Sequence, residues 1–88
     1  MGDATIYGRL TLRMVRVVSR LALHDSYETI AGDLSLDRRT VAGDVARAKT
    51  LTGCETQAEL VHWWHTNYRP FARWLLESLG IDPLEMIV

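Results

Sequence analysis

Two adjacent arginines, Arg38 and Arg39, are the side chains of this sequence best suited to chemistry with another molecule. Asp37 precedes them, and its carboxylate can accept hydrogen bonds from the free amides that begin a helix. Long donors in the first turn of a helix can reach base edges in the major groove of DNA, where an arginine pairs bidentately with guanine. We therefore expect one arginine to contact a base and the other a phosphate. The alternative is that both are solvated on an exposed helix.

Other side chains near this pair are candidates for contacts with the phosphate backbone. Thr40 either meets a phosphate through its hydroxyl or bonds back to Asp37. Ser26 and Tyr27 begin the preceding helix, where free amides favour a phosphate, although an ordinary cap and a half-buried ring explain them equally well. Gly43 in mid-helix costs about 1 kcal/mol relative to alanine, which indicates close approach to DNA or to another helix. The further cations available for phosphates are Arg13, Arg47 and Lys49.

Apolar residues at helical spacing and capping residues predict the elements that position these side chains. The first helix spans residues 11–23. A second helix of about two turns begins at Asp25 or Ser26 and ends before a turn at residues 35–36. The third begins at Asp37 and carries the two arginines in its first turn. Its outward face is expected to present the candidate cations.

The second part of the chain is predicted to form two more helices. Thr56 and Glu59 have the spacing of a capping box, which predicts a fourth helix over residues 55–67. Pro70 suits the first turn of a fifth helix, which Gly80 ends. No strand-like alternation is visible, so the expected fold class is all-α.

Aromatic residues are concentrated near the C-terminus, where five of the seven lie between residues 63 and 74. A three-helix core of this size cannot bury so many large rings, so some should meet a second surface. One hypothesis is that the fifth helix folds back on the first; we favour a two-fold dimer through the fourth and fifth helices. The apolar tail at residues 84–88 is expected to pack on its own domain or on a partner. The expected interface residues are Trp63, Trp64, Tyr68, Phe71, Trp74 and Leu75.

The overall composition fits one small domain of 88 residues with a formal net charge of −1. The charge is unevenly distributed, because residues 1–50 hold eight Lys/Arg against six Asp/Glu and residues 51–88 hold two against five. Cys54 is the single cysteine, which excludes an internal disulfide, and neither a signal peptide nor a long apolar run is visible. We therefore expect a cytoplasmic protein without membrane contact.

Metal binding and catalysis are not expected. His62 and His65 form an H-x-x-H pair near Cys54, but a structural zinc ion needs four ligands at recognisable spacing. The sequence has no phosphate loop, nucleophile elbow or paired-carboxylate signature. No cofactor, metal or enzymatic activity is therefore predicted.

Four short motifs share the spacing of a known family. They are L-T-x-R at residues 10–13, S-x-x-x-I-A-x-x-L at residues 26–34, T-V at residues 40–41 and A-E-L-V at residues 58–61. On these motifs the chain resembles the LuxR-type (GerE-like) helix-turn-helix domain, and its middle is similar to region 4 of sigma factors. The resemblance implies a four-helix helix-turn-helix domain over residues 1–61, followed in one compact unit by an aromatic-rich helical extension over residues 62–88.

The outer face of the third helix departs from the family. The LuxR-type pattern usually has lysine at Ala42, histidine at Asp44 and a basic residue at Leu51. Because these departures lower the positive charge expected there, Arg38 and Arg39 must contribute more to any contact with DNA.

Together these patterns predict a small stand-alone transcription regulator of bacterial or phage origin that binds double-stranded operator DNA as a homodimer. A different class of protein stays open: a module that contacts RNA polymerase, a sigma factor or another regulator, which Ala42 and Asp44 favour. A third alternative is a recombination directionality or DNA-architecture factor, which predicts cooperative binding to adjacent sites.

Overall fold

The protein is all-α, as the sequence predicts, and no strand occurs within residues 2–82. These are the residues that the computed structural model describes, with side chains from Thr5 onward. The helices are α1 (Gly2–Arg9), α2 (Leu12–Ala22), α3 (Tyr27–Leu34), α4 (Arg38–Thr52) and α5 (Gln57–Ser78). The packing predicted for the tail at residues 84–88 falls outside the described part of the chain.

Side-chain caps begin four of these helices, and those of α3, α4 and α5 are residues that the sequence singles out. The hydroxyls of Thr11 and Ser26 accept hydrogen bonds from amides three residues later, which satisfies donors that a helix start leaves unpaired. The Asp37 carboxylate caps α4 by accepting a hydrogen bond of 3.4 Å from the amide of Arg39, two residues later. At α5 both halves of the Thr56 and Glu59 capping box are present.

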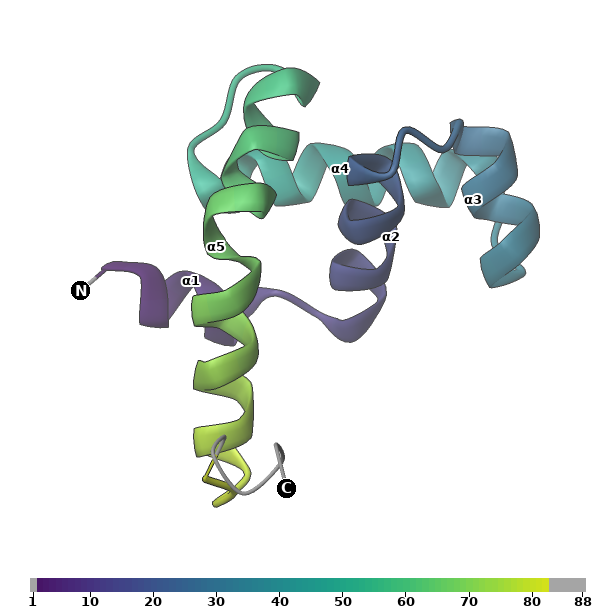
Figure 1. The fold of residues 1–88 in the computed structure, drawn as a ribbon. Coiled ribbons are helices and arrows are strands. Elements are labelled where there is room, and N and C mark those ends of the chain that lie inside the picture. Colours follow the sequence, from purple (N-terminus) through teal and green to yellow (C-terminus); the bar gives the residue numbers. More distant parts are fainter. Residues whose placement is uncertain (1, 83–88) are drawn as a thin grey trace.

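The core surrounds α2, which packs against α3, α4 and α5. In Figure 1, α4 runs behind α2 from α3 on one side to the start of α5 on the other. The buried apolar residues at the centre are Met14, Val17, Val18 and Leu21 of α2, Ile30 and Ala31 of α3, Val41, Val45 and Ala48 of α4, and Leu60 of α5. This arrangement leaves the far side of α4 facing solvent along most of its length.

The last helix differs from its prediction, because α5 runs unbroken through Pro70 where two helices were expected. The proline ring removes one helical N–H, but Pro70 is exposed, so water can solvate the carbonyl that loses its partner. Asn67 and Phe71 are buried on either side of the proline. Both of these residues pack on Tyr7 of α1, which keeps the helix continuous across the proline. The predicted boundary at residues 67–70 is therefore wrong.

Helix α1 was not predicted from the sequence, and a buried side chain attaches it to the fold. Tyr7 is 5% exposed, and its hydroxyl donates a hydrogen bond of 2.8 Å to Oδ1 of Asn67 on α5. Its ring lies 5.4 Å from that of Phe71 and 5.9 Å from that of Trp74, centre to centre. Figure 1 shows α1 beside the middle of α5, whose second half extends past both α1 and α2.

Candidate nucleic-acid interface

The first turn of α4 presents the two arginines that the sequence selects. Both side chains are exposed, and neither makes an ion pair with any described residue. Together with Tyr27, Asp37 and Ala42, they line a shallow depression between the starts of α3 and α4. The side-chain donors of Arg38 and Arg39 are therefore free for a ligand.

Small residues follow Arg39 along the outward face of α4. Ala42 and Ala46 are exposed, and Gly43 is half-buried. A Cβ atom at Gly43 would meet only the guanidinium of Arg47, at 3.8 Å, among the described residues. No other helix approaches Gly43, so of the two reasons suggested by the sequence, close approach of another helix is wrong and close approach of DNA stays a prediction.

Asp44 occupies a different position from the one that the sequence indicates. It is 1% exposed, so it does not place an acidic group on the outward face of α4. Its Oδ2 accepts a hydrogen bond of 2.7 Å from Nε of Arg13. Its Oδ1 accepts bonds of 3.0 Å from Nη2 of Arg13 and 2.6 Å from Nη2 of Arg47.

The electrostatics of this cluster follow from its geometry. Burial raises the pKa of the Asp44 carboxyl, but the hydrogen bonds and charges of Arg13 and Arg47 more than offset this, so the pKa lies below its ordinary value. The same contacts raise the pKa of Arg13. Asp44 is thus ionised and neutralised by two side chains that stay about half exposed, at 49% and 60%.

The start of α3 is less open than the sequence suggests. Ser26 serves as the cap, with its hydroxyl accepting from the amide of Thr29 at 3.1 Å. Tyr27 is half-buried, and its hydroxyl donates a hydrogen bond of 3.0 Å to Gln57 at the start of α5. Both side chains therefore fit the ordinary explanation of a cap and a packed ring.

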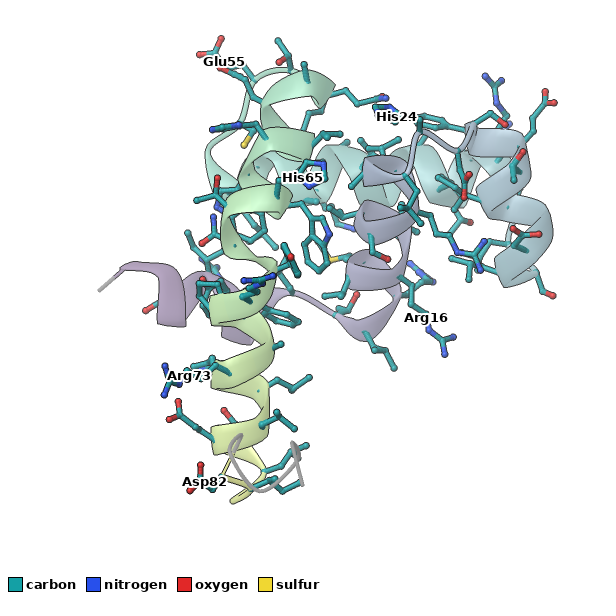
Figure 2. All side chains as sticks on the ribbon, in the orientation of Figure 1. Arg16, His24, Glu55, His65, Arg73 and Asp82 are labelled. Carbon is teal, nitrogen blue, oxygen red and sulfur yellow. The ribbon has the colours of Figure 1, made fainter. Side chains whose placement is uncertain are left out.

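The remaining candidate residues lie at the margins of the face. Thr40 and Lys49 are half-buried. Arg20 on α2 is paired with Asp33 and, at 3.8 Å, with Asp25. Figure 2 shows Arg16 extending away from α2 into solvent.

The aromatic residues expected at an interface are divided by the structure. Phe71 is 8% exposed, and Trp63, Trp64 and Trp74 are half-buried. Tyr7, which the sequence did not bring into this group, contacts Trp63, Phe71 and Trp74 and covers part of it. Phe71 is therefore covered within the chain, while Tyr68 and Leu75 stay open, at 40% and 39% exposed, and the expectation that some of these rings meet a second surface stays a prediction.

Within residues 2–82 the chain forms neither a metal site nor a membrane-spanning helix. No group of three or more His, Cys, Asp or Glu side chains is arranged to hold a metal ion there. None of the described helices combines the length and apolar character needed to cross a membrane.

Sequence reasoning missed the pairing of Arg13 with Asp44 because the two residues are 31 positions apart. The spacing of Asp44 and Arg47 on one helix was the only local signal of the cluster.

No protein-family model, no curated protein and no solved structure matches the chain.

Proposed function

We propose that the protein is a sequence-specific regulator of transcription that binds double-stranded DNA through a helix-turn-helix formed by α3, the turn at Ser35 and α4. The observation that carries the proposal is the pair of exposed, unpaired arginines in the first turn of α4. A helix inserted in the major groove reads bases from this position. One bidentate contact between an arginine and guanine supplies about 1–3 kcal/mol of discrimination.

The burial of Asp44 supports DNA as the partner of this face. With that carboxylate withdrawn and paired, the outward side of α4 carries Arg39 and Arg47 beside small residues. Small side chains let the helix backbone approach the groove, and the cations neutralise phosphates on its rim. This face of α4 is therefore more positive than the sequence suggests.

The resemblance to LuxR-type domains and to sigma factor region 4 supports the same function. It suggests a bacterial or phage regulator acting in the cytoplasm and binding a palindromic operator as a homodimer. In such a dimer, two recognition helices would lie about one DNA turn apart.

The test begins with selection of bound duplexes from random DNA, followed by fluorescence anisotropy with the selected duplex and a scrambled one. The wild-type protein should prefer the selected duplex. Replacement of Arg38 and Arg39 together by alanine should lower that preference at least about tenfold, which corresponds to loss of one base contact, while circular dichroism stays unchanged. Arg73→Ala removes one charge from the second half of α5 and serves as the control (Figure 2). An unchanged preference in the double variant would overturn the proposal.

One observation favours the second candidate function, a module that contacts RNA polymerase or another regulator. Tyr68 and Leu75 on the second half of α5 are exposed, as is Leu79, the C-cap of this helix. Asp44, in contrast, gives no support to this candidate because it is buried. The module predicts that regulation is lost on substitution of Leu75 and Leu79 but is kept when Arg38 and Arg39 are replaced.

A further inference from the structure

Arg13 and Arg47 approach one another from two different helices, α2 and α4. Both donate to the same oxygen of Asp44, at 3.0 Å and 2.6 Å, so their Nη2 atoms converge on one point. Arg13 makes a second bond through Nε to the other oxygen, which fixes the plane of its guanidinium. Two like charges are thus held side by side by a carboxylate beneath them.

This cluster has unused donors and unbalanced charge on its outer side. Arg13 uses two of its N–H donors on Asp44 and Arg47 uses one, so the other guanidinium donors of each are available. Two guanidinium groups and one carboxylate leave a net charge of one positive unit. A phosphodiester has one negative charge and acceptor oxygens that suit a guanidinium fork.

The cluster also lies in line with the proposed reading arginines. Arg39, Gly43 and Arg47 follow one another at four-residue spacing, which aligns them along one side of α4. From Arg39 to Arg47 the helix advances about 12 Å. A duplex lying on this side of α4 would therefore reach both the first turn and the Asp44 cluster.

We propose that Arg13 and Arg47 form a single clamp for one DNA phosphate, with Asp44 as the positioning residue that holds the two guanidinium groups together. The clamp rests on the proposed function, because DNA is its ligand. A phosphate contact carries no sequence information, so the clamp can be tested on a duplex of arbitrary sequence.

Asp44→Asn separates positioning from simple electrostatics, because the two predict opposite results. Removing a negative charge beside two arginines should strengthen binding to DNA if Asp44 has no positioning role. The clamp predicts instead that affinity for a 30-base-pair duplex falls roughly 3- to 10-fold, since the guanidinium groups lose their common anchor. Binding as tight as that of the wild type, or tighter, would overturn the clamp.

Arg13→Gln and Arg47→Gln, alone and together, test whether one phosphate or two are bound. Glutamine keeps a neutral donor near Asp44, so these variants also serve if Asp44→Asn does not fold. If the two arginines hold one shared phosphate, the double variant should lose little more affinity than whichever single variant binds DNA more weakly. Its slope of log affinity against log salt should fall by about 0.9 per bound protomer, whereas two separate phosphates would give about 1.8 per bound protomer.

The matched control is Arg73→Gln, which removes one positive charge from the second half of α5 and should leave the salt slope unchanged. A double-variant loss equal to the product of the single losses would overturn the clamp while leaving the proposed function intact. If the wild type binds every duplex equally, sequence reading by Arg38 and Arg39 is contradicted. The clamp is then still tested by the change in salt slope. Absence of binding to any duplex would overturn both.

Discussion

Asp44 illustrates how a single buried carboxylate can connect two helices. Desolvation alone would penalise its charge, and two arginines that donate three hydrogen bonds more than offset that penalty. The folded protein therefore binds a proton at Asp44 more weakly than the unfolded chain does. This contribution to stability is present above the unfolded pKa of about 3.8 and is lost as pH falls through the lower folded pKa.

Asp44→Asn should lower the free energy of unfolding at pH 7 by about 2–3 kcal/mol, because charge-assisted hydrogen bonds are lost. Urea unfolding at pH 7, 4 and 3 measures the difference. The free energies of unfolding of variant and wild type should converge as pH falls. Protonation of Asp44 removes from the wild type the carboxylate charge that the substitution has already removed from the variant. A constant difference across this range would contradict the proposed linkage.

Glu59 should contribute to the same acid sensitivity. Hydrogen bonds from the backbone amides of Glu55 and Thr56 lower the pKa of Glu59 in the capping box of α5. Glu59→Gln therefore provides a comparison in which the acid dependence weakens without any change in the Asp44 cluster.

Gly43→Ala should raise the free energy of unfolding by about 1 kcal/mol, because alanine favours the helix and its Cβ meets only an ordinary contact at 3.8 Å. If DNA lies on this side of α4, the same methyl group should weaken binding several-fold. Thermal unfolding and anisotropy measure the two effects. Gly32→Ala is the control, since nothing lies within 4 Å of its Cβ position and it should stabilise the protein without weakening DNA binding. Unchanged DNA binding in Gly43→Ala would remove Gly43 from the interface.

At the scale of helices, the sequence predicts what depends on local signals. Ser26 and Asp37 mark the starts of α3 and α4 correctly, because caps act on neighbouring amides. α1 has no comparable signal: it has eight residues, includes two glycines and is too short to be stable in isolation. Its formation depends on the contact of Tyr7 with α5, a partner 60 residues away.

Pro70 misled the prediction because its local preference for a helix start was outweighed by packing on both sides. Pro70→Ala should therefore raise the free energy of unfolding by about 1–3 kcal/mol, since it restores a helical hydrogen bond within a continuous α5. Chemical denaturation measures this gain. Two separate helices with Pro70 in a first turn would give no gain, because the missing N–H is unpaired there in any case. Ala72→Gly, at an exposed position two residues later, should cost about 1 kcal/mol, because this position is helical.

At the scale of the whole molecule, α1 changes the expected use of the aromatic residues. Composition alone suggests that 88 residues cannot cover these rings, but Tyr7 closes over Phe71 and Trp74 from within the chain. The open apolar residues are farther along the chain: Leu75 on α5 is 39% exposed, and Leu79, the C-cap of α5, is 66% exposed. An interface on α5 is therefore expected at its second half, beyond the tryptophans of its first half.

A homodimer through this surface predicts a specific response to charge. Leu75→Arg together with Leu79→Arg should shift the protein from dimer to monomer in sedimentation equilibrium, because each buried leucine contributes about 1.5–3 kcal/mol and an arginine there would be desolvated. Leu23→Arg is the control, since Leu23 is 71% exposed just after α2 and is not part of the Leu75 and Leu79 surface. The monomeric variant should bind an isolated half-site as the wild type does but lose the added affinity for a palindrome, because the two reading heads are no longer joined. A wild-type protein that sediments as a monomer at high concentration would contradict the dimer and leave the single α4 to account for all DNA binding.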